Sequence, residues 1–309
     1  MRENRGMEGD PVHRRNLEVA LDPESGGRRE VRGQIVDRRL QGYTFTGGRI
    51  VGPGPVHDMS AHLVLDVRTG RIEAASGAMA LPAFPGTATT RFEGCRDVLP
   101  NLAGLAGLAA AGDLVAGIRA AIGRERGCYH LSTLVLAMAP LLRAALREPE
   151  PRDARFERAI ELTACETGAG RVRLHGLLFE KRGQGQPRRA RLAWGVDPGE
   201  MKLRQVVAEA APELAPAPEA AAALEGVPLF GGFARAALER LGPLAGADEL
   251  LELALALNAV VTQALVTVPS ARDPRLEAGQ NRAHGTCYMW RAGGPLESMP
   301  SGKLGGGRT

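Results

Sequence analysis

The 309-residue sequence has few aromatic side chains and no long apolar run. Phenylalanine, tryptophan and tyrosine make up only 4% of it. No window of about 18 uninterrupted apolar residues occurs, so we expect no membrane-spanning helix. The first residues lack the apolar core of a secretory signal, and their acidic side chains argue against a transit peptide. We therefore expect a cytoplasmic protein whose four cysteines, Cys95, Cys128, Cys165 and Cys287, are thiols rather than disulfides.

Neither sign of charge is in large excess, because the sequence has 39 basic and 35 acidic residues. The basic residues are dispersed or terminal and are not interleaved with aromatic ones, so nucleic acid is not an expected partner. The sequence contains no phosphate-cradling glycine loop, no nucleophile elbow and no twin Cys-x-x-Cys motif. A small-molecule substrate is the expected partner, and the oligomeric state is left open, with a homo-oligomer among the alternatives.

The hydrophobic pattern predicts an α+β fold. Strand-like segments around 31–40, 57–67 and 72–75 are separated by turn residues and predict an antiparallel meander, followed by helices up to about residue 147. Residues 105–147 align without a gap with 224–266, with glycines in register, which indicates an internal duplication. We therefore predict a tandem duplication, each copy a three-stranded antiparallel meander followed by helices.

This interpretation divides the chain into five parts. They are a poorly ordered arm over 1–29, a first copy carrying the site over 30–147, a linker over 148–158, a second copy over 159–268 and an irregular C-terminal segment over 269–309.

Metal-competent side chains concentrate in the first copy. Cys128 and His130 open an apolar helix, whose free N–H groups favour a thiolate. His57, with Asp58 beside it, and Cys95 lie upstream. Thiolate and imidazole groups are good ligands for Zn²⁺ or Fe. We therefore predict that Cys95, Cys128, His130 and His57 bind a single metal ion, with an iron–sulfur cluster as the alternative cofactor.

Catalytic roles are expected for His57 and Asp58. Asp58 could be a ligand, orient His57 or act as a general base. His62 lies an odd number of residues from His57, so in a regular strand it faces the other way. A metal-free alternative uses Cys128 as nucleophile, with a histidine as base. From the C-terminal segment, His284 and Cys287 are left as further candidates or as packed residues.

The two predicted copies differ at these positions. Cys128 aligns with Ala247 and His130 with Glu249, while His57 falls opposite Gln186. Since the second copy keeps the apolar pattern without these ligands, the fold does not require them. The comparison places the site in the first copy.

Two resemblances follow from these motifs. His57-Asp58-Met59, Cys95 and Gly127-Cys128-Tyr129-His130-Leu131 resemble an uncharacterised bacterial family with an HDM strand, a single cysteine and a GCxHL helix start. The resemblance covers most of residues 31–147 and implies little about activity. Genes for its members often neighbour genes for catabolism of aromatic or other hydrophobic compounds. This implies an enzyme that acts on a small molecule.

The order of the motifs is also similar to the NifU/IscU-type iron–sulfur scaffold fold. In that resemblance His57-Asp58 stands at the first ligand motif, Cys95 at the second, and Cys128 with His130 at the third. It implies a scaffold for iron–sulfur or sulfur transfer. The histidine in place of a first cysteine favours a mononuclear site instead. The leading hypothesis is a metal-dependent lyase or hydrolase acting on a small, partly apolar or aromatic catabolic substrate.

Overall fold

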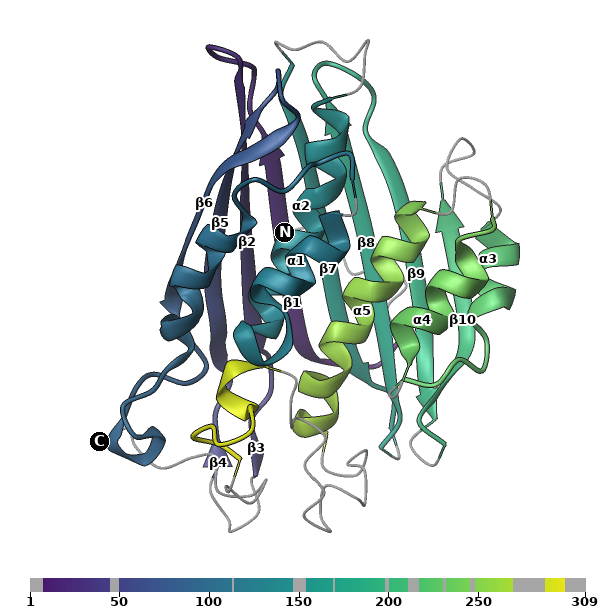
Figure 1. Ribbon diagram of the computed structural model, residues 1–309. Helices are drawn as coiled ribbons and strands as arrows, with labels where there is room; N and C mark the ends of the chain where they lie inside the picture. The colour runs from purple at the N-terminus through teal and green to yellow at the C-terminus, as the bar shows by residue number, and fades with distance from the viewer. Residues whose placement is uncertain are drawn as a thin grey trace.

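A single antiparallel sheet of eight strands forms the framework, in the order β10-β9-β8-β7-β1-β2-β5-β6 (Figure 1). The computed structural model describes residues 8–44, 50–112, 114–146, 154–168, 170–197, 200–210, 217–229, 232–244, 248–268 and 287–297. The first half of the chain supplies β1 (Asp10–Leu21), β2 (Arg28–Arg39), β5 (Gly54–Asp66) and β6 (Arg71–Leu81). The second half supplies β7 (Phe156–Glu166), β8 (Val172–Arg182), β9 (Arg188–Asp197) and β10 (Lys202–Ala210). A separate hairpin consists of β3 (Tyr43–Thr44) and β4 (Ile50–Val51).

Helices lie over one face of the sheet, as Figure 1 shows. The long helix α2 (Tyr129–Ala144) packs on β1, β2 and β5, and the long helix α5 (Asp248–Thr267) packs on β7, β8 and β9. The first half carries η1 (Ala88–Thr90), η2 (Cys95–Leu105), α1 (Leu114–Ile122), η3 (Arg124–Arg126) and α2 (Tyr129–Ala144). The second half carries α3 (Ala217–Leu224), α4 (Phe233–Leu241), α5 (Asp248–Thr267) and η5 (Tyr288–Trp290). Among the described helices, none combines the length and apolarity needed to cross a membrane.

The predicted tandem of three-stranded meanders is wrong, although the α+β class is confirmed. Eight strands share one continuous sheet, and each half contributes four of them. The additional strand of the first half is β1, which lies inside the predicted arm over 1–29. β1 pairs with both β2 and β7, so it joins the two halves of the sheet. The other predicted boundaries remain predictions, although β7 begins at Phe156, inside the predicted linker.

The strand β1 escaped prediction because charged residues interrupt its alternation. Leu17, Val19 and Leu21 face the helices and are buried, as a half-buried strand requires. Two residues on the same face, His13 and Arg15, are polar, yet both are buried as well. The segment therefore resembles a polar arm, although every second side chain enters the interior.

Two glycines bring the long helices close to the sheet. A Cβ atom added to Gly33 in β2 would lie 2.9 Å from Cδ1 of Leu134 in α2. A Cβ atom added to Gly176 in β8 would likewise lie 2.9 Å from Cδ1 of Leu253 in α5. Because glycine has no side chain, each helix lies directly on its strand. In the first half this sets the distance between α2 and the sheet.

Candidate metal centre

Strand register places a set of polar side chains beneath the start of α2. Arg15 in β1 stands opposite Asp37 in β2, and Asp37 stands opposite His57 in β5. Directly opposed residues of neighbouring strands carry their side chains on the same face of the sheet. His130, in the first turn of α2, approaches this row from the helix layer. Three strands and one helix therefore converge on one buried point.

Asp37 is the centre of this group. Arg15 donates from Nε to Oδ1 of Asp37 at 2.6 Å and from Nη2 to Oδ2 at 2.7 Å, and both side chains are fully buried. Nδ1 of His57 lies 2.8 Å from Oδ2 of the same carboxylate. Because a carboxylate only accepts hydrogen bonds, the proton of His57 is on Nδ1. The arginine pair leaves lone pairs on the carboxylate for further ligands.

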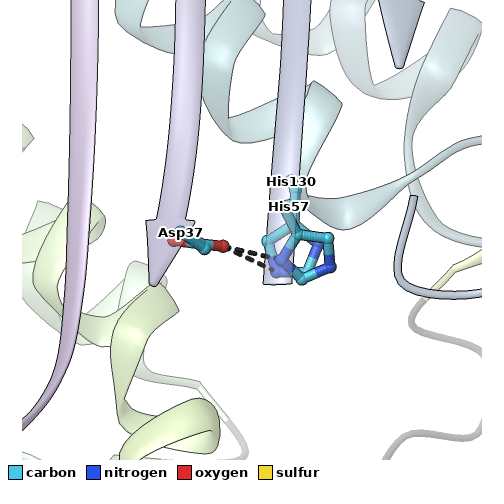
Figure 2. A group of neighbouring side chains, drawn as sticks. All are labelled: Asp37, His57 and His130. Atoms are coloured by element: carbon cyan, nitrogen blue, oxygen red, sulfur yellow. Dashed lines mark hydrogen bonds and ion pairs between the residues drawn. The ribbon is translucent and has the colours of Figure 1, made fainter. Parts of the chain in front are cut away.

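His130 completes a possible set of ligands. Its Nε2 lies 3.9 Å from Oδ2 of Asp37, and its ring packs against that of His57 at a tilt of 32°, with centroids 3.9 Å apart (Figure 2). The three donor atoms lie within 4.8 Å of one another, a proximity that no other three His, Cys, Asp or Glu side chains reach in the described residues. Two imidazoles and a carboxylate are a donor set used for Fe(II) and for catalytic Zn²⁺.

The surroundings put these groups in the protonation state that a metal ion requires. Burial raises the pKa of Asp37, but the Arg15 charge, the hydrogen bonds of His57 and Arg15, and the nearby His13, whose Nε2 lies 3.5 Å from Oδ1, outweigh it and hold this pKa well below its ordinary value. Burial, with the nearby His57 and Arg15, lowers the pKa of His130 well below 6.5. At neutral pH the carboxylate is therefore charged and His130 is neutral, as ligation demands.

The two predicted thiol ligands lie outside this group. Cys128 immediately precedes α2, and its Sγ is 3.9 Å from Nδ1 of His130, the ring nitrogen that does not face Asp37. Burial raises the pKa of Cys128 to about 11 and that of Cys95 to about 12. Desolvation outweighs the helix N-terminus, so both are thiols in the metal-free protein rather than the thiolates expected from sequence.

Asp58 does not face the centre. It follows His57 in β5, so strand alternation directs it to the opposite face of the sheet. There its Oδ1 accepts a hydrogen bond from Nε2 of Gln34 at 2.8 Å. The expected catalytic pairing with His57 is therefore not assembled. His62 also turns to that face, where it contacts Glu30.

The C-terminal segment contacts the start of α2. The backbone N–H of Tyr288 donates to the carbonyl of Gly127 at 2.8 Å, which places Cys287 beside the Cys128 region. The Tyr288 hydroxyl donates to Glu93 at 3.0 Å, a second attachment of this segment. His284 lies outside the described residues.

Sequence reasoning missed Asp37, Arg15 and His13. The available signal was a charged residue on the apolar face of an alternating strand. Val31, Gly33 and Ile35 share a face of β2 with Asp37, and burial of that face continues as far as Asp37. The identity of the facing residues depends on register between strands, which the local pattern does not contain.

Comparison with known proteins adds a family likeness without an activity. Residues 13–143 match a family model described as "Protein of unknown function (DUF2889)". The matched stretch begins at His13 and contains all three candidate ligands. No curated protein matches the chain, and no solved structure matches it. The likeness to an uncharacterised family is thus confirmed in coarse form, whereas the similarity to NifU/IscU-type scaffolds gains no support.

Proposed function

We propose that this protein is a metal-dependent enzyme in which Asp37, His57 and His130 hold a single divalent ion, Zn²⁺ or Fe²⁺. The observation that carries the proposal is the convergence of three donors, from β2, β5 and α2, within 4.8 Å in a buried setting. Asp37 is held ionised and His130 neutral, so both present lone pairs to an ion without a prior change of protonation.

The donors fit an ion with limited rearrangement. Oδ2 of Asp37 and Nδ1 of His57 are 2.8 Å apart and share one proton. An ion bound to both would take the place of that proton, and Nε2 would then be the protonated ring nitrogen of His57. Arg15 continues to hold both oxygens of the carboxylate and keeps it oriented.

Such an ion would polarise a substrate oxygen or activate a bound water, the chemistry of hydrolases and lyases. The residues around it determine access. His130 retains 16% exposure of its side chain, while Asp37 and His57 are almost completely covered. Tyr129, with 41% exposure, sets its ring edge-on to His130 at a centroid distance of 5.9 Å. An apolar surface beside the most accessible ligand supports a small, partly apolar or aromatic substrate.

The alternatives have less support. A metal-free thiol enzyme needs a reactive thiolate, yet burial raises the pKa of Cys128 to about 11. An iron–sulfur scaffold needs thiolate ligands, and the closest donor group contains two histidines and one aspartate.

Metal analysis tests the proposal. Protein purified without added metal is equilibrated with Zn²⁺, or with Fe²⁺ under anaerobic conditions, and the retained metal is measured by mass spectrometry after desalting. We expect a single ion per chain for one of the two metals. The His130→Ala variant should lose the ion while remaining folded by circular dichroism. Wild-type protein that retains neither metal contradicts the proposal.

A further inference from the structure

Each imidazole has two nitrogens, and in His130 they face different partners. Nε2 is directed to Asp37 at 3.9 Å, and Nδ1 is directed to Sγ of Cys128, also at 3.9 Å. The two nitrogens lie on different sides of the ring. An ion shared by His130 and Asp37 therefore sits on the Nε2 side, away from the sulfur of Cys128.

The sulfur is held in place by the structure around it. Cys128 has an extended backbone, with φ of −105° and ψ of 129°, and directly precedes α2. Its carbonyl accepts the N–H of Ser132 at 2.9 Å, which anchors it to the first turn. The preceding residue, Gly127, is bonded to Tyr288, so the C-terminal segment closes over the same turn. Cys128 itself is only 6% exposed.

Metal-bound histidines almost always donate their second N–H to a nearby acceptor, which fixes the tautomer and the ring plane. The sulfur of cysteine is a weak acceptor. For Nδ1 of His130, the sulfur of Cys128 at 3.9 Å is the acceptor in the right position.

We propose that Cys128 is a positioning residue: its sulfur accepts the Nδ1–H of His130 and so presents Nε2 to the ion. This inference rests on the proposed metal centre and deepens it. It differs from the expectation from sequence, in which Cys128 and Cys95 ligate the ion directly. The role of Cys128 is to fix one tautomer of one ligand.

Cobalt(II) distinguishes a ligand from a positioning residue, because a cobalt–thiolate bond gives an intense near-ultraviolet charge-transfer band. We expect the cobalt-loaded wild-type protein to lack this band. Affinity for Zn²⁺ is then measured by competition with a chromophoric chelator. Cys128→Ala should weaken binding by about 10–100-fold, the usual effect of losing such a partner. Cys128→Ser, which restores an acceptor oxygen, should recover most of the affinity. Cys165→Ala, which removes a buried thiol from β7, is the matched control and should bind like wild type.

Nitrogen NMR of the zinc-loaded wild-type protein provides a readout that needs no variant. We expect His130 to be ligated through Nε2 and protonated on Nδ1. A thiolate band that disappears in Cys128→Ala, ligation through Nδ1, or equal affinity of Cys128→Ala and wild type would each overturn the positioning role. Equal affinity by itself would leave the proposed metal centre intact, whereas a thiolate band or ligation through Nδ1 would also place the ion on the Cys128 side of His130, away from Asp37. Wild-type protein that binds neither metal would instead refute the proposed function and this inference with it.

Discussion

The two halves of the sheet present related polar clusters with different chemistry. In the first half, Arg15 of β1 stands opposite Asp37 of β2, which stands opposite His57 of β5. In the second half, Arg158 of β7 stands opposite Glu180 of β8. Glu180 in turn stands opposite Arg188 of β9. Each cluster lies under a long helix, α2 or α5. An arginine on one strand and an acid on the next are common to both.

The remaining positions separate the two clusters. Where the first half has His57 and His130, the second has Arg188 and Glu249, joined by a hydrogen bond from Arg188 Nη2 to Glu249 Oε1 at 2.8 Å. Glu252 of α5 also pairs with Arg158. Guanidinium groups carry no lone pair for a metal ion. The second cluster is therefore an ion-pair network without imidazole groups, and the comparison identifies the two imidazoles as the groups that distinguish the cluster of the first half.

Neutralising the central acid should have the largest effect on stability. Asp37→Asn leaves Arg15 buried without a counter-ion, and we expect a loss of about 3–5 kcal/mol in the free energy of unfolding. Glu180→Gln should have a smaller effect, because Arg158 keeps its hydrogen bond to the carboxyl group of Glu252. Urea unfolding measures both. If Glu180→Gln also abolishes metal binding, the distinction between the two clusters fails.

Converting one cluster into the other tests the comparison directly. The double variant His57→Arg with His130→Glu gives the first half the residues of the second. We expect it to lose the ion, because both nitrogen ligands are removed, and to stay folded, because the new charges can pair. Metal content and thermal unfolding decide the outcome, with His62→Arg as a surface control. Retention of the ion by this double variant would contradict the assignment of His57 and His130 as ligands.

The pH dependence of stability should come partly from the second cluster. Burial raises the pKa of Glu252 to about 7, against the opposing effect of Arg158. The folded protein then holds a proton that the unfolded chain releases near pH 4.5. This stabilisation is therefore complete below about pH 4.5 and is lost as the pH rises to about 7, with a slope of at most about 1.4 kcal/mol per pH unit. Urea unfolding from pH 5 to 8 should show this decline in the wild type. The Glu252→Gln variant should lack it, and an unchanged slope would contradict the prediction.

The smallest effects are expected at the two close-packing glycines. Gly33→Ala and Gly176→Ala each press a methyl group against the ends of flexible side chains, and we expect about 1 kcal/mol of destabilisation for each. Only Gly33→Ala should also weaken metal binding, because it lifts α2 and thus His130. Chelator competition on both variants checks this, and equal weakening in both would break the proposed link between α2 and the ion.

Local patterns predicted part of this molecule. They located the strand that contains His57 and the start of the helix that contains His130, and both residues belong to the candidate centre. Alternation within β5 could also have excluded Asp58, which the prediction included. Local patterns could not predict Asp37 and Arg15 as part of the site, because the two residues are brought together by the pairing of β1 with β2. The single sheet was missed for the same reason, since the pairing of β1 with β7 joins distant parts of the chain.

The contact between Tyr288 and Gly127 sets an order of events during synthesis. The same tyrosine bonds Glu93, a residue 195 positions earlier in the sequence. A ribosome completes β1, β2, β5 and α2 long before it reaches Tyr288. The strands and helix that hold Asp37, His57 and His130 can thus meet while the turn before α2 is still uncovered. Closure of that turn therefore waits for a segment that is made late, after the elements that carry the proposed ligands are complete.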